Sequence, residues 1–260
     1  MNRVVFLGQK RAGELAFSRL VEAQGEAIQV VAVCSNPSAD NVWWGTNQIA
    51  KLATSIPFLS NESEDEDQLL EAMAERNANT LISVQHPHIL SEAVLEAVGY
   101  RAFNLHNAKL PDYRGSNAVN HAILNGDATY TSTVHWMVRK VDMGSIAYEE
   151  TIPIREDETA ESLYRRSTEA GLRCFEALLE AFQQAIEIPK DPLRGEGRFN
   201  SRTSIDGLRE IHDADDPVEV DRKSRAFFFP PFEPAFVVRG SKKYYVLPPG
   251  YAGTIERAKA

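Results

Sequence analysis

Asn104, His106 and Asp142 are the residues whose types and spacing best suit chemistry. Asn104 and His106 stand two residues apart at the end of the strand-like run Arg101 to His106. Both side chains therefore point to the same face of an extended backbone. Asp142 is expected at the end of a neighbouring strand or in the loop that follows it. If those strands are adjacent, an amide, an imidazole and a carboxylate converge at one spot.

This set of groups favours transfer of an acyl group. An asparagine amide can donate to a developing oxyanion, a histidine can exchange a proton near neutral pH, and a carboxylate can fix the charge state of the histidine. The two cysteines, Cys34 and Cys174, lie in apolar segments, so the nucleophile would come from a substrate. From spacing alone, a core histidine beside a strand-end asparagine is an equally good interpretation.

Alternating strands and helices are predicted to position these residues. Arg3 to Gly8, Ile28 to Ser35 and Thr80 to Val84 are short apolar runs, as in buried parallel strands, and stretches of helical spacing separate them. This order predicts an α/β fold with a mostly parallel sheet and right-handed crossovers. Ser116 is predicted to cap a short helix that ends at Asn125 and Gly126.

The second half of the chain contains the clearest helix, Thr159 to Gln184, in which apolar residues recur at three and four. Pro189 to Pro192 marks a change to short segments and turns. We therefore predict a catalytic domain at residues 1–188 and a small α+β region at residues 189–260. In that region Ala235 to Val238 and Tyr244 to Leu247 would pair as a β-hairpin.

Composition limits the classes of function. With 43% hydrophobic and 25% charged residues, the chain resembles an ordinary soluble globular protein. Its apolar runs are too short to span a membrane, and no leader precedes the first strand, so we expect a cytoplasmic protein with no membrane partner. A net charge of −9 argues against a nucleic-acid partner. Residues 190–260 carry 13 Lys and Arg against 11 Asp and Glu, a slight excess that could face a small phosphate-bearing molecule.

Two loops contain residues that could bind a ligand. The segment G-Q-K-R-A-G after the first strand is neither G-x-G-x-x-G nor a Walker loop, which gives a dinucleotide site little support. Lys10 in this turn could contact a phosphate or be a solvated loop charge. His86 and His88 have a spacing that a metal could use, but no third ligand is obvious. A substrate-lining loop is favoured and no metal is expected. Both cysteines are expected to be buried free thiols.

Two motifs resemble those of the folate-dependent formyltransferase family. They are N-L-H-x-A-K-L-P-D-Y-R-G, which begins at Asn104, and T-x-H-x(6)-D-x-G-x-I, which ends at Ile146. The resemblance implies a Rossmann-like formyl-transfer domain that uses N10-formyltetrahydrofolate as formyl donor. It also implies that Asn104, His106 and Asp142 are the catalytic trio. The segments that hold the pterin in this family match His86, Pro87, His88, Ile89, Leu90, Val138 and Val141.

Within the family, the nucleotide-sugar N-formyltransferases resemble this chain most. They share the sequence K-L-P-D-Y-R-G and an R-A-F-x-F-P-P-aromatic segment, here Arg225 to Phe232. The resemblance implies an acceptor that is a nucleotide-linked 4-amino-4,6-dideoxy sugar, such as GDP-perosamine or a dTDP-linked sugar, used for O-antigen or other surface polysaccharides. The candidate contacts to this acceptor are Lys10, Asn107, Lys109, Arg114 and Phe232.

Several alternatives stay open at this point. A related enzyme could use methionyl-tRNA as acceptor, although the weakly charged C-terminal region counts against tRNA. A hydrolase could release formate, and a non-catalytic module could bind a nucleotide sugar or a folate. Phe232 is expected to be the exposed aromatic on which a nucleobase stacks. The C-terminal hairpin could serve as a homodimer surface.

Overall fold

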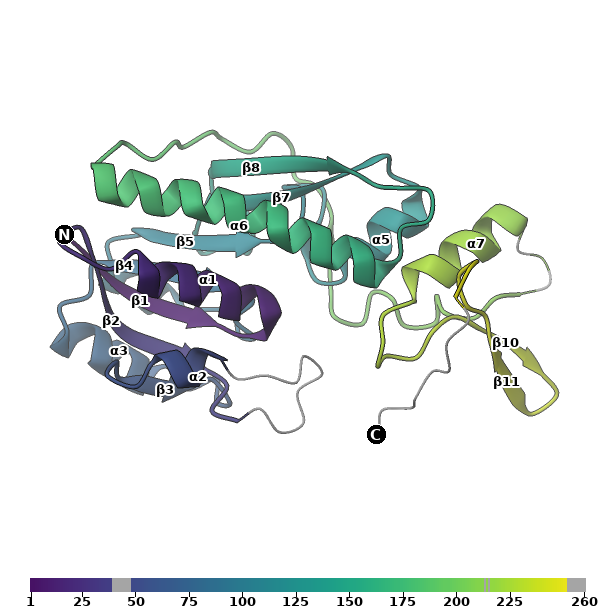
Figure 1. The fold of residues 1–260 in the computed structure, drawn as a ribbon, viewed down its shortest axis with the longest axis horizontal. Coiled ribbons are helices and arrows are strands. Elements are labelled where there is room, and N and C mark those ends of the chain that lie inside the picture. The colour runs from purple at the N-terminus through teal and green to yellow at the C-terminus, as the bar shows by residue number, and fades with distance from the viewer. Residues whose placement is uncertain (39–47, 213, 215, 252–260) are drawn as a thin grey trace. The chain divides into compact units, whose positions relative to one another are not determined.

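The computed structural model describes residues 1–38, 48–212, 214 and 216–251. Helices and strands alternate along most of this chain (Figure 1). The strands are β1 (Asn2–Gly8), β2 (Ile28–Ser35), β3 (Phe58–Ser60), β4 (Thr80–Val84), β5 (Ala102–His106), β6 (Arg114–Gly115), β7 (Thr129–Trp136), β8 (Ile146–Pro153), β9 (Phe199–Asn200), β10 (Phe236–Arg239) and β11 (Lys242–Tyr245). The helices are α1 (Lys10–Glu22), α2 (Gln48–Leu52), α3 (Asp67–Glu75), α4 (Glu92–Ala97), α5 (Ala118–Asn125), α6 (Ala160–Gln184) and α7 (Pro217–Ala226).

The fold is built on a seven-stranded sheet with the strand order β3-β2-β1-β4-β5-β7-β8. The pairs β2–β3, β1–β2, β1–β4 and β4–β5 are parallel, whereas β5–β7 is antiparallel. The strands β10 and β11 form a separate antiparallel hairpin. The predicted fold class, a mostly parallel α/β sheet with a C-terminal hairpin, is confirmed.

Strand β1 shows why its sequence is apolar throughout. Val4 and Phe6 join one hydrophobic cluster, which includes residues of α1 and the second half of α6. Val5 and Leu7 join another, which includes residues of α3 and α4. Alternate side chains of a strand point to opposite faces, so a strand with helices on both faces needs an apolar residue at every position.

The described chain divides into two compact units. The first unit comprises Met1–His106, Ser132–Glu150 and Ala170–Gly195, and the second comprises Asn107–Thr131, Thr151–Glu169 and residues from Glu196 onward. Each unit thus combines segments that are distant in the sequence. The division of function between residues 1–188 and 189–260 stays a prediction.

The second unit has a core of its own. Side chains of α5, of the start of α6 and of the segment around Phe227 form one buried cluster. Asn120 in α5 donates a hydrogen bond of 2.7 Å from Nδ2 to the carbonyl oxygen of Ala226 at the end of α7. The end of α7, directly before the aromatic segment Phe227 to Phe232, is therefore fixed to the core of this unit.

The structure corrects one predicted helix cap and adds a short pairing. The residue before α5 is Asn117, not Ser116, and it has a left-handed backbone with φ of 60° and no capping hydrogen bond from its side chain. Asparagine tolerates this conformation better than most residues. Arg114 and Gly115 pair in parallel with Phe199 and Asn200, a two-residue ladder too short to leave a pattern in the sequence.

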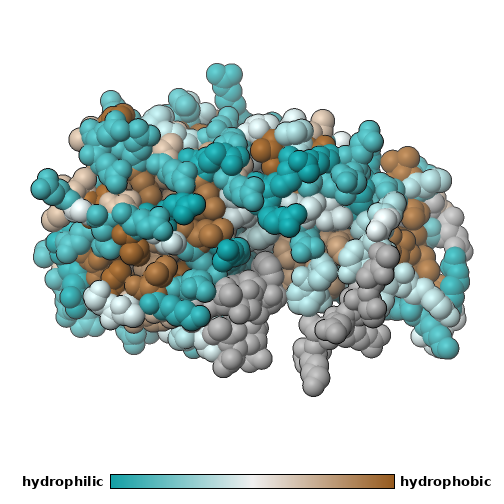
Figure 2. Space-filling model, viewed as in Figure 1, coloured by the Kyte–Doolittle hydropathy of each residue, from teal (hydrophilic) through white to brown (hydrophobic). Residues whose placement is uncertain are grey.

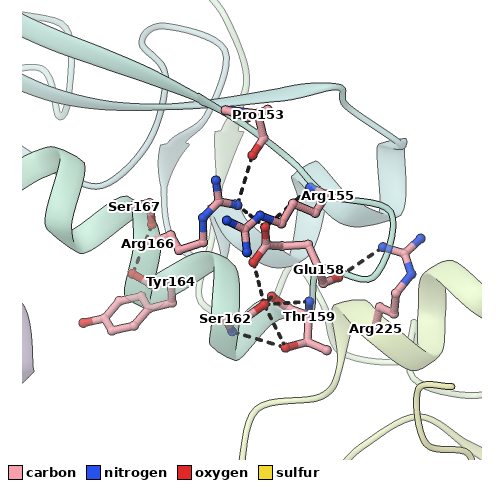
Figure 3. Close-up of polar contacts among 9 residues, drawn as sticks. All are labelled: Pro153, Arg155, Glu158, Thr159, Ser162, Tyr164, Arg166, Ser167 and Arg225. Carbon is pink, nitrogen blue, oxygen red and sulfur yellow. Dashed lines mark hydrogen bonds and ion pairs between the residues drawn. The ribbon is translucent and has the colours of Figure 1, made fainter. Parts of the chain in front are cut away.

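A buried acidic residue, Glu158, organises the start of α6 (Figure 3). Its carboxylate accepts hydrogen bonds from the Ser162 hydroxyl at 2.6 Å and pairs with the guanidinium of Arg166. Its backbone carbonyl accepts a hydrogen bond of 3.1 Å from Nη1 of Arg225. Because Arg225 lies in α7, this one residue connects the start of α6 to the helix that precedes the aromatic segment.

Replacing Glu158 by glutamine is expected to lower the free energy of unfolding by about 3 kcal/mol, because the change leaves a largely buried Arg166 without its counter-charge. Urea unfolding followed by circular dichroism measures this. The control is Glu150→Gln, since the Arg173–Glu150 pair is more exposed, with 55% and 32% of the side chains accessible, and pairs of this kind are worth about 0–1 kcal/mol. Equal losses in the two variants would contradict the expectation.

Gly144 lies where no side chain fits. A Cβ atom at this position would stand 1.6 Å from the carbonyl oxygen of Trp136 and 2.7 Å from its carbonyl carbon, and backbone atoms cannot move aside cheaply. Gly144→Ala is therefore expected to destabilise the fold by about 1–3 kcal/mol in urea unfolding. Gly25→Ala is the matched control, because nothing lies within 4 Å of its added Cβ atom. A Gly144 variant as stable as the Gly25 variant would contradict this contact.

Candidate active site

The antiparallel pairing of β5 with β7 assembles the candidate site. In this register Asn104 stands opposite His135 and His106 stands opposite Thr133. Alternation along the two strands then places both histidines and the asparagine on one face of the sheet. His106, His135 and Asp142 are buried, whereas Asn104 is half-buried.

His135 lies at the centre of the group. Its Nε2 is 3.1 Å from Nδ2 of Asn104 and 3.4 Å from Oδ1 of Asp142, and its Nδ1 is 2.8 Å from the carbonyl oxygen of Trp136. The structure therefore brings Asn104 and Asp142 together around a fourth residue. We refer to Asn104, His106, His135 and Asp142 as the polar cluster.

Asp142 lies between the two imidazoles. Its Oδ2 is 3.9 Å from Nδ1 of His106, while its Oδ1 faces His135. The residue lies in the loop after β7 and has a left-handed φ of 54°. Such a backbone is uncommon for a non-glycine residue and is often found at functional sites. A carboxylate in this place can balance a positive charge on either ring.

The sequence prediction missed His135. The signal was present, since this residue is the histidine of the T-x-H part of the second motif. Its neighbours Thr131 and Thr133 are also buried polar residues, at alternate positions of one strand. Without the strand register, however, nothing in the sequence shows that His135 stands opposite Asn104.

The loop predicted to hold the pterin follows β4. His86 in this loop has a buried Nδ1 that makes no hydrogen bond among the described residues. Burial, with a smaller contribution from the charge of His88, lowers the pKa of His86 to about 4, so its ring is neutral at physiological pH. An unsatisfied nitrogen on a neutral ring is a suitable partner for a polar, uncharged heterocycle.

The other residues of this prediction have mixed surroundings. Ile89 and Val138 are exposed, at 72% and 40%, and offer apolar contact. His88 is held by a hydrogen bond of 2.8 Å between Nε2 and the carbonyl oxygen of Asn61. Leu90 packs against the cluster formed with α3 and α4. Pro87 and Val141 are half-buried. The orphaned nitrogen and the exposed apolar groups fit a pterin, and the assignment stays a prediction.

The predicted acceptor contacts are distributed over both units. In the first unit, Nζ of Lys10 donates a hydrogen bond of 3.3 Å to Oε1 of Gln85. In the second, Nδ2 of Asn107 donates to the Ser167 hydroxyl at 2.8 Å. The guanidinium of Arg114 lies 6.0 Å from the centre of the Phe199 ring.

Lys109 lines a cavity in the second unit. The cavity has a volume of about 420 Å³, and its walls include Lys109, Asp112, Tyr113, Asn125, Asp127 and Arg198. Lys109 pairs with Asp112 at 2.9 Å. Tyr113 donates to Asp127, and the burial and this hydrogen bond raise the pKa of Tyr113 to about 12. The cavity thus combines hydroxyl, amide and charged groups.

Phe232 is the exposed residue of the aromatic segment, with 47% of its surface accessible. Phe227 and Phe228 are buried. Phe229 is half-buried and lies between the rings of Tyr164 and Phe232, with ring centres 5.5 Å and 5.8 Å apart. The expectation that Phe232 exposes a flat apolar face is met, whereas a nucleobase on that face stays a prediction.

The family model for formyl transferases matches residues 2–179. The chain belongs to the formyl transferase family. The prediction of a formyltransferase enzyme is therefore confirmed at the level of the family. This match includes all four residues of the polar cluster.

Relatives and solved structures extend the comparison. The chain is 31% identical to the GDP-perosamine N-formyltransferase of Brucella melitensis biotype 1. The alignment extends over 245 residues and covers 94% of this chain and 92% of the relative. A 4-N formyltransferase from Francisella tularensis has a TM-score of 0.77 at 16% identity, covering 94% of this chain and 96% of the other. An N-formyltransferase from Helicobacter canadensis has a TM-score of 0.75 at 19% identity, and the match covers 94% of this chain and 86% of the other. At these identities, the two structures show a shared fold.

The hydropathy of the surface and of the helices shows no membrane-spanning character among the described residues. Figure 2 shows hydrophilic residues over much of one face, with apolar residues in separate patches. Among the described residues, no helix combines the length and the apolar character that crossing a membrane requires.

Proposed function

We propose that this chain transfers the formyl group of N10-formyltetrahydrofolate to the C4 amine of a nucleotide-linked 4-amino-4,6-dideoxy sugar. The observation that carries the proposal is the identity of 31% to a GDP-perosamine N-formyltransferase, which extends over almost the whole of both chains. The Helicobacter canadensis structure, which contains folinic acid and dTDP-3-aminofucose, supports a folate and a nucleotide-linked amino sugar as the two ligands, whereas the choice of the C4 amine rests on the perosamine relative. The polar cluster supplies groups suited to this reaction.

The mechanism follows from the chemistry of the cluster. The formyl donor supplies an electrophilic carbon and a leaving amine when it is bound. The neutral amine of the acceptor adds to that carbon, and the amide of Asn104 donates to the oxyanion that forms. His106, with the carboxylate of Asp142 3.9 Å away, takes up the proton that the attacking nitrogen loses. A proton returned to the leaving nitrogen completes the exchange, so no group on the protein is consumed.

An acceptor panel tests this proposal. The enzyme is incubated with N10-formyltetrahydrofolate and GDP-perosamine, a dTDP-linked 4-amino-4,6-dideoxy sugar, methionyl-tRNA, or no acceptor, and products are identified by mass spectrometry. A formylated nucleotide sugar is the expected product. Formylation of methionyl-tRNA alone, or formate released at the same rate without acceptor, would overturn it. The absence of transfer to every acceptor would point to a binding module.

Phe232→Ala is expected to raise the KM for the nucleotide sugar by roughly 10-fold, because stacking of one base on an aromatic ring is worth about 1–3 kcal/mol. The kcat should change less, since the ring would contact a part of the acceptor that does not react. Steady-state kinetics with varied nucleotide sugar measures both values. Tyr100→Ala, which removes an exposed aromatic ring from the first unit, is the control. An unchanged KM in the Phe232 variant would remove this residue from the site.

The proposal extends to the oligomeric state of the enzyme and to its location in the cell. The hairpin β10–β11 exposes Tyr244 and Tyr245, at 53% and 37%, which is compatible with a homodimer surface. We place the enzyme in the cytoplasm without a nucleic-acid partner, where activated sugars for surface polysaccharides are made. Light scattering after size-exclusion chromatography, with and without nucleotide sugar, measures the oligomeric state. A strictly monomeric enzyme would remove the dimer from the proposal.

A further inference from the structure

His135 lies within 3.4 Å of Asn104 and Asp142, two of the three residues predicted to be catalytic. It is 2% exposed, and both of its ring nitrogens lie within hydrogen-bond distance of a named partner. A buried histidine with this many polar neighbours has a fixed ring orientation. Its two nitrogens can therefore be assigned from the chemistry of the groups that they face.

A backbone carbonyl determines whether Nδ1 of His135 carries a proton. The carbonyl oxygen of Trp136 can only accept a hydrogen bond, so Nδ1 of His135, 2.8 Å away, must carry a proton and donate. In the neutral ring the other nitrogen, Nε2, is then an acceptor. The group at 3.1 Å from it is Nδ2 of Asn104, which can only donate. These two contacts agree with the tautomer that carries its proton on Nδ1. Oδ1 of Asp142 also faces Nε2, but at 3.4 Å it lies beyond the ~2.7–3.2 Å of a typical N–H···O hydrogen bond.

The amide of Asn104 is fixed by the same contact. One of its two Nδ2 hydrogens is bound to His135, and the carbonyl side of the amide must point away from that ring. The second Nδ2 hydrogen remains for another acceptor. If the amide turned over, its oxygen would face the unprotonated Nε2, and two acceptors would repel each other.

We propose that His135 is a positioning residue for formyl transfer, which accepts a hydrogen bond from Asn104 and so keeps the amide nitrogen available to the oxyanion. This inference rests on the proposed formyl transfer. The charged and titratable neighbours around His135 are Asp142, at 3.4 Å, and His106, whose ring centre is 6.4 Å away. Since a positioning residue acts in the transition state, its loss should lower kcat and leave both KM values near those of the wild type.

Two variants separate positioning from packing. His135→Leu fills the space but accepts no hydrogen bond, and we expect kcat to fall by ~10²-fold, which is the cost of losing one oxyanion donor. His135→Gln places a side-chain carbonyl near the position of Nε2, and we expect kcat to recover to within roughly 10-fold of the wild type. His121→Gln is the matched control, because this buried histidine bonds the Ser204 hydroxyl at 2.8 Å within the second unit. We expect its kcat to be unchanged.

Nitrogen-15 NMR of the histidine side chains in the wild-type enzyme tests the same idea without activity. The expected spectrum assigns the His135 proton to Nδ1 and shows a coupling from Asn104 Nδ2–H to Nε2. A proton on Nε2, a leucine variant with normal kcat, or equal losses in the leucine and glutamine variants would overturn the proposal. If the leucine variant does not fold, the NMR result decides. Failure of the wild type to formylate any amino sugar would refute the proposed function instead, leaving the tautomer measurable.

Discussion

Replacement of His106 by asparagine is expected to lower the kcat of formyl transfer by ~10²- to 10⁴-fold, which is the usual contribution of a positioned acid–base group. Asparagine keeps a polar side chain at the position but cannot take up a proton at neutral pH. Binding of the nucleotide sugar should stay measurable by calorimetry, because the imidazole acts on the reacting nitrogen. Steady-state formylation assays with saturating acceptor give kcat directly.

The control for this variant is His212→Asn, since 60% of the His212 side chain is exposed and the residue lies outside the polar cluster. Its kcat should match that of the wild type. Near-normal turnover in the His106 variant would mean that another group handles the proton. Loss of nucleotide-sugar binding together with turnover would indicate a damaged site rather than missing chemistry.

The second large effect is expected for Asp142→Asn. The amide has the size of the carboxylate, and asparagine is among the few residues that accept the left-handed φ of 54° found here, so the backbone should not change. What is lost is the negative charge beside the two imidazoles. We expect kcat to fall by ~10²- to 10⁴-fold, because the protonated histidine that forms during the reaction is no longer stabilised.

Asp157→Asn, at an exposed position, removes the same charge from the net total and should leave kcat unchanged. The Asp142 variant should also bind the nucleotide sugar, as measured by calorimetry. Turnover within a few-fold of the wild type would exclude a catalytic role for this carboxylate. A loss of unfolding free energy comparable to that expected for Gly144→Ala would indicate a structural role.

Much of the sheet could be predicted from the sequence, because strands such as β1 and β4 are buried on both faces and must be apolar at nearly every position. The long helix α6 was predicted to within one residue at its start, since three- and four-residue spacing persists for many turns. The ladder between β6 and β9 could not be predicted. Two residues contain no periodicity, and the pairing depends on Gly115, where a Cβ atom would lie 2.3 Å from the carbonyl oxygen of Asn200.

The sequence predicts those site residues that share one strand, but not the residue that a neighbouring strand contributes. Asn104 and His106 share a strand, so their alignment follows from alternation alone. His135 belongs to another strand, and its place depends on a register that the long connection between β5 and β7, which contains β6 and α5, does not reveal. Glu158 ends the charged run Arg155 to Glu158, and charged residues are mostly exposed in folded proteins. It is buried because Arg166 and Ser162 satisfy its carboxylate, and partners of that kind cannot be identified before the fold is known.

The most direct test of the account is a double-mutant cycle over His106 and Asp142. If the polar cluster acts as one catalytic unit, the losses in kcat are not additive, and His106→Asn with Asp142→Asn should have a kcat within ~10-fold of the worse single variant. Binding of the nucleotide sugar should persist in all three variants. Losses that multiply, or a double variant with kcat close to that of the wild type, would contradict the account.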